Sequence, residues 1–196
     1  MRKMVVALAL LSLLAASCSS EPEELAGFVR DPLPSVAHIS LPDGDAGGAP
    51  FQMVAPEGEL LLVYFGYTEC PDVCPTTLAD LKKVMRQLGD DSERVTLAME
   101  TIDIERDTDD IITAYVQSFV PDAHGLRARD DETLRAAADT FGADYSVEVN
   151  DEGVYEVMHT AHTYAVNDEG LILVTWAFGT EAEIITKDIQ LLLKEM

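Results

Sequence analysis

Apolar positions along the chain occur in blocks whose spacing changes between that of a strand and that of a helix. A continuous apolar run covers residues 60–65, between Gly58 and Gly66, and such a run is typical of a strand buried on both faces. Apolar residues then recur at helical spacing from Leu78 to Leu88, and Gly89 follows the last of them. We therefore expect a central strand followed by an amphipathic helix.

The rest of the chain continues this alternation. The expected elements are a strand at 95–102, helices at 111–119 and 134–141, a hairpin at 147–157, strands at 163–166 and 171–177, and a helix at 181–196. Strands that alternate with helices indicate a parallel sheet covered on both faces, and the late hairpins add antiparallel pairs. The order predicts an α/β, thioredoxin-like fold with a central mixed sheet flanked by helices. Chemistry in such folds lies beyond the carboxyl end of a central strand.

The N-terminus has the features of an export signal. Arg2 and Lys3 precede an apolar run too short to span a bilayer. Small residues then lead to Cys18, as in a bacterial lipoprotein box, although Ala15 stands where Leu is more usual. We expect residues 1–17 to be a lipoprotein signal peptide and Cys18 to carry lipid. The alternative is a plain secretory signal.

Composition separates a tether from the domain and excludes some partners. Residues 18–34 are polar and broken by prolines, which predicts a flexible tether, and residues 35–196 are the size of one domain. The formal charge of the chain is −23, and loss of Arg2 and Lys3 with the signal would make it −25. So acidic a protein is not expected to bind nucleic acid or anionic lipid. Attachment to a membrane would depend on the N-terminal lipid alone.

The loop after the central strand holds Cys70 and Cys74, the only cysteines outside the N-terminal segment. We expect the next helix to begin at about Pro75 with Cys74 as its cap, because proline is tolerated at the first helical position. The helix dipole then favours thiolates, whereas Glu69 and Asp72 oppose them. A structural disulfide closing so short a loop would constrain little chain entropy. The pair is therefore a redox couple or half of a metal site.

Histidines could complete such a metal site. His38 and His124 are expected to be solvated, whereas His159 and His162 precede the strand at 163–166, where a thioredoxin-like fold faces its cysteine loop. Two thiolates and one imidazole suit Cu(I), and zinc would need an added water or carboxylate. No proline follows Pro121, so the cis-proline of ordinary thioredoxins is missing, and three residues separate the cysteines instead of two.

The chain resembles the Sco/SenC family of copper-binding, thioredoxin-like proteins over most of residues 35–196. The segment 64–78 is similar to the cysteine motif of the family, and residues 102–108 are similar to a second signature with Ile104 in place of a proline. His159 falls at the metal-binding histidine of the family. Two further departures are Glu69, where the family often has His, and Met158, where it often has Asp.

The resemblance implies that Cys70, Cys74 and His159 bind copper. We expect Asp103 and Asp107 to support the cysteine loop, and a solvated acidic loop is the alternative. The resemblance also implies a role in assembling the copper A centre of cytochrome c oxidase subunit II. The leading hypothesis is a lipid-anchored copper chaperone on the outer side of a bacterial membrane, with subunit II as partner. Other copper chaperones or thiol reductants are further partners. The alternatives are a thiol–disulfide oxidoreductase, in which Cys70 and Cys74 act catalytically, and a redox or copper sensor.

Overall fold

A mixed seven-stranded sheet forms the centre of the protein. The computed structural model describes residues 24–196, so the expected signal peptide and Cys18 lie outside the described residues. The strand order is β2-β1-β5-β4-β3-β8-β9. The central strand β3 (Leu60–Gly66) pairs in parallel with β4 (Val95–Thr101) and antiparallel with β8 (Thr163–Val166). The other antiparallel neighbour of β8 is β9 (Ile172–Trp176). The structure thus has the expected α/β, thioredoxin-like architecture.

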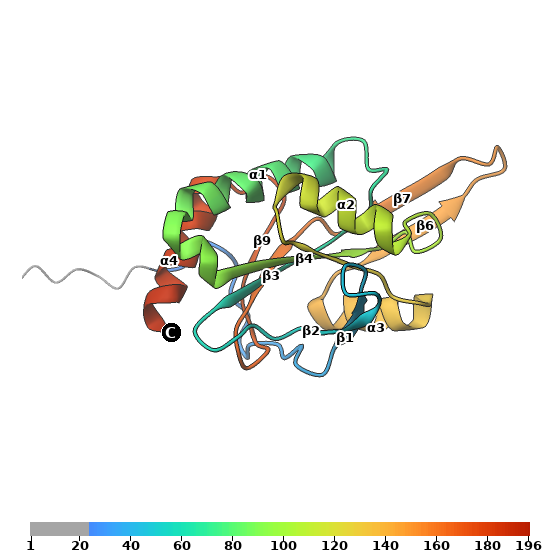
Figure 1. Cartoon of the computed structure of the whole chain (residues 1–196). Coiled ribbons are helices and arrows are strands. Elements are labelled where there is room, and N and C mark those ends of the chain that lie inside the picture. Colours follow the sequence, from blue (N-terminus) through green and yellow to red (C-terminus); the bar gives the residue numbers. More distant parts are fainter. Residues whose placement is uncertain (1–23) are drawn as a thin grey trace, which may run out of the picture.

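Helices cover both faces of this sheet (Figure 1). Three helices pack together on one face: α1 (Val73–Leu88), α2 (Asp109–Phe119) and α4 (Ala182–Glu195). The opposite face carries α3 (Asp131–Phe141), where the ring of Phe141 contacts Phe65 of β3 and Tyr164 of β8. A 3-10 turn, η1 (Gly89–Arg94), connects α1 to β4.

A short hairpin and one further strand, which the sequence analysis did not predict, extend the sheet. They are β1 (Ser40–Asp43), β2 (Ala49–Gln52) and β5 (His124–Leu126). The expectation that His124 is solvated is wrong, because its Nδ1 lies 2.7 Å from a carboxylate oxygen of Asp43 and its ring packs on Phe51. These strands have three or four residues each, which is too short for a periodic pattern to be recognised.

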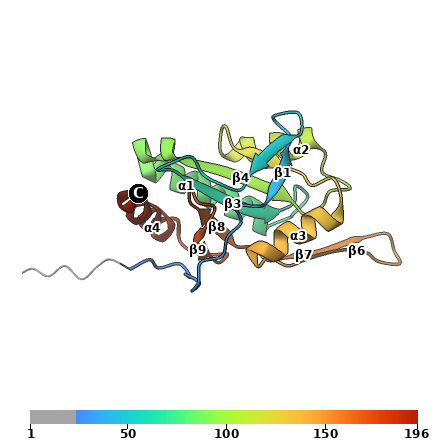
Figure 2. The same cartoon turned by 90° about the horizontal axis from the view of Figure 1, so that it is seen from below.

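A second, two-stranded sheet projects from the body of the molecule (Figures 1 and 2). It consists of β6 (Tyr145–Val149) and β7 (Tyr155–His159), joined by the predicted turn. The hairpin begins two residues earlier and ends two residues later than the sequence indicated. His159 is consequently the last residue of a strand, where the projecting sheet meets the body.

The described part of the expected tether contacts the domain. The backbone N–H groups of Ala26 and Gly27 donate to the carboxylate of Asp188, which also accepts from the indole of Trp176. Phe28 forms a bridge to Thr175 of β9. Residues 26–28 are therefore part of the folded unit, and residues 18–23 lie outside the described part. Among residues 24–196, no helix combines the length and the apolar character needed to cross a bilayer.

Candidate metal centre

The cysteine loop lies between the carboxyl end of β3 and the first turn of α1. The helix begins at Val73 and Asp72 occupies its N-cap position without a side-chain hydrogen bond. The expectation that Cys74 caps the helix is therefore wrong, because the helix starts two residues before Pro75. Instead, the backbone N–H of Cys74 donates to Sγ of Cys70 at 3.2 Å. The sulfur of Cys70 thus accepts a bond at a helix N-terminus, where the dipole favours negative charge.

His159 faces this pair from the end of β7. Its Nε2 lies 3.5 Å from Sγ of Cys74, and its Nδ1 lies 3.3 Å from the carbonyl oxygen of Thr160. An imidazole nitrogen can bond to a carbonyl oxygen only as a donor, so Nδ1 carries the hydrogen and Nε2 keeps its lone pair. The edges of Tyr64 and Tyr67 pack against the imidazole, with ring centres 6.2 and 5.9 Å away. The ring is therefore held with its basic nitrogen toward the sulfurs.

The three donor atoms are close enough to share one ion. The sulfurs of Cys70 and Cys74 and a ring nitrogen of His159 all lie within 4.8 Å of one another. Metal–ligand bonds of about 2.0–2.3 Å, as at zinc sites, require donors no more than about 4.6 Å apart. The donor atoms would therefore have to move by only a few tenths of an ångström to bind one metal ion. Burial lowers the pKa of His159, which keeps the imidazole neutral and able to bind a metal.

Burial affects the two thiols differently. Cys74 is fully buried, and this burial raises its pKa to about 12. Burial also raises the pKa of Cys70, but hydrogen bonds from Cys74 and Tyr67 outweigh it, so that the pKa of Cys70 falls below its usual value. Cys70 is therefore the more acidic and more reactive sulfur of the pair.

We expect iodoacetamide to modify Cys70 of the reduced, metal-free protein much faster than Cys74. Because the thiolate is the nucleophile, the rate at Cys70 should reach half its maximum below pH 9, the ordinary pKa of a cysteine thiol. Cys74 should stay protonated and unreactive up to about pH 12. Mass spectrometry of peptides after timed quenching measures both rates. Equal rates at the two cysteines would contradict the asymmetry.

Asp107 anchors the cysteine loop from the connection between β4 and α2. Its buried carboxylate accepts from the backbone N–H and the hydroxyl of Thr68, and from the hydroxyl of Thr101 at 2.6 Å. Thr68 stands two residues before Cys70, so this carboxylate fixes where the loop leaves β3. The sequence analysis named Asp107 as a support, and the structure places it in direct contact with the loop.

Asp103 acts on the cysteine loop through Arg106, a residue that the sequence analysis did not single out. The guanidinium of Arg106 pairs with the buried Asp103 and lies 2.6 Å from the carboxylate of Glu69. It also lies 4.0 Å from the centre of the Tyr155 ring on β7. Arg106 thus connects the cysteine loop to the hairpin that carries His159. The signal that could have found it was its place in the segment 102–108, which resembles the second family signature.

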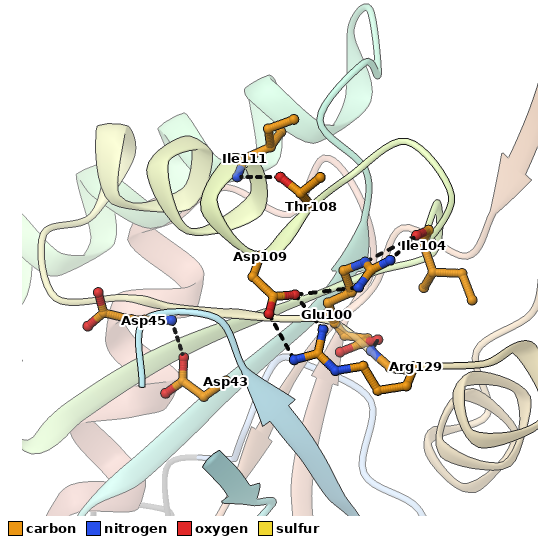
Figure 3. A network of polar contacts seen from close by, with 10 residues as sticks. Asp43, Asp45, Glu100, Ile104, Thr108, Asp109, Ile111 and Arg129 are labelled. Carbon is orange, nitrogen blue, oxygen red and sulfur yellow. Dashed lines mark hydrogen bonds and ion pairs between the residues drawn. The ribbon is translucent and has the colours of Figure 1, made fainter. Parts of the chain in front are cut away.

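A polar network holds the connection that carries these supports (Figure 3). Arg127 donates to the carbonyl oxygen of Ile104 at 3.1 and 2.7 Å. Arg129 forms two hydrogen bonds to Asp109, at 2.6 and 2.8 Å. Both arginines follow β5, so the connection is tied on either side of Asp107 to the end of the sheet.

Two other residues of the sequence analysis lie away from the donor atoms. The side chain of Met158 is 72 % exposed, because neighbouring residues of a strand point to opposite faces and His159 points inward. His162 is half-buried in a separate pocket with Arg30 and Phe141. Neither belongs to the group formed by Cys70, Cys74 and His159.

Comparison with known proteins agrees with this architecture. The SCO1/SenC family model matches residues 44–194. The mitochondrial SCO2 homolog of Mus musculus is 34 % identical over 136 residues, which cover 68 % of this chain and 53 % of that protein. The matches cover between about half and two thirds of the length of the first curated relatives.

Solved structures show the same relationship. Apo Sco1 of Thermus thermophilus superposes with a TM-score of 0.74 at 31 % identity, covering 86 % of this chain and 97 % of that one. ScoI of Bradyrhizobium japonicum, solved with copper bound, has a TM-score of 0.67 at 28 % identity, covering 78 % and 95 %. With its fold, its cysteine loop and the family model in agreement, the chain belongs to the SCO1/SenC family.

Proposed function

We propose that this protein binds copper through Cys70, Cys74 and His159 and helps to metallate the copper A centre of cytochrome c oxidase. The observation that carries the proposal is the convergence of two sulfurs and an imidazole within 4.8 Å. Soft sulfur donors in a low-coordinate set favour Cu(I). Copper-bound ScoI of Bradyrhizobium japonicum, to which this chain is similar, supports the choice of metal.

Copper is the cargo in this proposal, and the chain supplies the binding site and its exposure to a partner. Cys74 and His159 hold the inner side of the site, whereas Cys70 is 9 % exposed and has the lower pKa. A thiol of the partner would approach from the side of Cys70. The Sco protein BsSco, whose fold is similar, is described as belonging to a family of cytochrome c oxidase assembly proteins. We assign subunit II of the oxidase as the partner.

The proposal includes anchoring by lipid on Cys18, with the domain on the outer side of a bacterial membrane. Residues 18–25 would then connect the lipid to the domain, since the backbone contacts the domain from Ala26 onward. Eight extended residues reach at most about 29 Å. Such a connection would keep the copper site within reach of a membrane-bound oxidase.

A second candidate function is reduction of the oxidase cysteines. The observation in its favour is the unequal acidity of Cys70 and Cys74. The thiolate of Cys70 would attack a target disulfide and release one target thiolate. Cys74 would then resolve the mixed disulfide, so that Cys70 and Cys74 become a disulfide as the target gains two thiols. His159 has no required role in this exchange.

Deletion of the gene and complementation test the proposal. The wild-type gene should restore the copper A absorbance and the oxidase activity, and the His159→Ala gene should not. Added copper should partly rescue the deletion, and an added thiol reductant alone should not. Rescue by reductant and by His159→Ala would favour the oxidoreductase. Normal oxidase activity in the deletion strain, with altered gene expression, would favour a sensor.

A further inference from the structure

The hairpin β6–β7 has an apolar inner face that starts at the metal centre and continues beyond the body of the protein. Residues paired across the hairpin share a face, and the inner pairs are Tyr145 with His159, Val147 with Val157, and Val149 with Tyr155. The first pair is at the centre and the second packs partly on the core. The third pair is largely uncovered, because Val149 is 56 % and Tyr155 41 % exposed.

Within residues 24–196, the guanidinium of Arg106 lies over the ring of Tyr155, while Val149 and part of Tyr155 stay exposed. Val154, at the tip, is also 53 % exposed. A contiguous set of exposed apolar side chains on one projecting element indicates an interaction surface. The outer face of the same hairpin is different, since it presents Glu148 and Glu156 to solvent. Met158 is also exposed on that outer face, so the continuous apolar stripe, and not every apolar side chain, lies on the side that faces the metal centre.

A groove of about 320 Å³ lies beneath the hairpin and continues this surface. Its lining combines apolar side chains of the hairpin and of the segment after β4 with three carboxylates and one arginine. The lining residues are Ile102, Asp103, Ile104, Glu105, Asp131, Arg135, Tyr145 and Val147. The apolar stripe and the groove therefore form one surface next to His159.

The charge of the groove is net negative. Arg135 is already engaged, since it donates to the carbonyl oxygen of Tyr145 and lies over the ring of the same residue. Asp131 accepts the hydroxyl of Tyr145. By contrast, Oδ1 of Asp103 has no hydrogen-bond partner although the residue is only 2 % exposed. Its other oxygen pairs with Arg106, so the carboxylates of the groove that a partner can reach are those of Glu105 and Asp131.

We propose that this surface, the stripe Val149–Tyr155 together with the groove, binds an extended segment of the protein that exchanges copper with this chain. The segment carries apolar side chains flanked by Lys or Arg. The apolar side chains cover Val149 and the exposed part of Tyr155, and the basic ones complement the exposed carboxylates of Glu105 and Asp131. Bound in this way, the partner places its own metal ligands beside His159 and Cys70. The identity of the partner rests on the proposed function, whereas the apolar stripe and the groove do not depend on it.

Selection of short random peptides on the immobilised full chain tests this proposal. Enriched peptides should combine apolar residues with Lys or Arg, and fluorescence anisotropy of synthesised examples measures their affinity. Val149→Ser and Glu105→Lys should each weaken binding by about fivefold or more, because each removes part of a complementary surface. Glu148→Ser, on the outer face beside Val149, is the matched control and should change affinity by less than about twofold.

Peptides enriched in acidic residues, or equal binding by wild type and Val149→Ser, would overturn the proposal. Copper stoichiometry of the same variants separates it from the proposed function, since neither Val149 nor Glu105 is among the three donors. If the wild type bound peptides through Val149 but took up no copper, the proposed function would fail and the surface would stand. If the Val149→Ser variant bound copper and transferred it normally to the oxidase subunit, the docking surface would be wrong and the proposed function would stand.

Discussion

Replacement of His159 by Ala should lower the affinity of the protein for Cu(I) by at least about 100-fold, since loss of a ligand exceeds the effect of losing an outer contact. The imidazole Nε2 lies 3.5 Å from Sγ of Cys74 and is aimed at the cysteines by the contact of Nδ1 with Thr160. Removal of the ring leaves two sulfurs, and within the described residues no other His, Cys, Asp or Glu joins their group. Competition with a coloured Cu(I) chelator measures the change.

His162→Ala is the matched control for this variant. His162 comes from the same segment and is half-buried, but it lies outside the donor group. Its replacement should leave the Cu(I) affinity unchanged. A wild-type affinity in His159→Ala, with an unaltered thermal unfolding curve, would show that the three-ligand model is wrong.

Replacement of Asp107 by Ala should lower the free energy of unfolding by about 3 kcal/mol, because three donors lose a buried charged acceptor. Those donors are the backbone N–H and hydroxyl of Thr68 and the hydroxyl of Thr101. Release of Thr68 also frees the loop that carries Cys70, so the Cu(I) affinity should fall by about tenfold, as for other outer contacts of metal sites. Urea denaturation and chelator competition measure the two effects.

Glu105→Ala is the control for Asp107→Ala, because Glu105 is exposed on the same connection and makes no contact with the cysteine loop. It should change neither stability nor Cu(I) affinity. Asp107→Asn, which keeps an acceptor oxygen, should have an intermediate effect. A large loss of stability in Asp107→Ala with unchanged Cu(I) affinity would show that the loop does not depend on this carboxylate for its position.

Glu69 is one of the positions at which this chain departs from the usual sequence of the family. The family often has His at the position of Glu69, and here the carboxylate pairs with Arg106. The same guanidinium contacts Asp103 and the ring of Tyr155. Glu69 therefore has a structural use of its own in this chain, as the link between the cysteine loop and the hairpin.

The long elements could be predicted from the sequence because their signal is local. The apolar run of β3 and the helical spacing in α1 depend only on neighbouring residues, and their bounds agree with the structure within a few positions. The start of α1 differed because Pro75 is also tolerated at the third helical position, where its missing N–H is one of those without a helical partner. Strands β1, β2 and β5 were missed since their pairing joins segments far apart in the chain.

By itself, the sequence determined the fold class, the cysteine loop at the end of a central strand, and the family to which the chain belongs. Only the tertiary structure decided how these parts meet. The antiparallel pairing of β8 with β3 brings His159 to Cys74, and burial makes the two thiols unequal. The place of Arg106 between loop and hairpin is likewise a tertiary fact. The distance between His159 and Cys74 and the burial of the two thiols depend on segments far apart in the chain. A local sequence pattern carries no information about how such segments meet, so only the folded structure decides them.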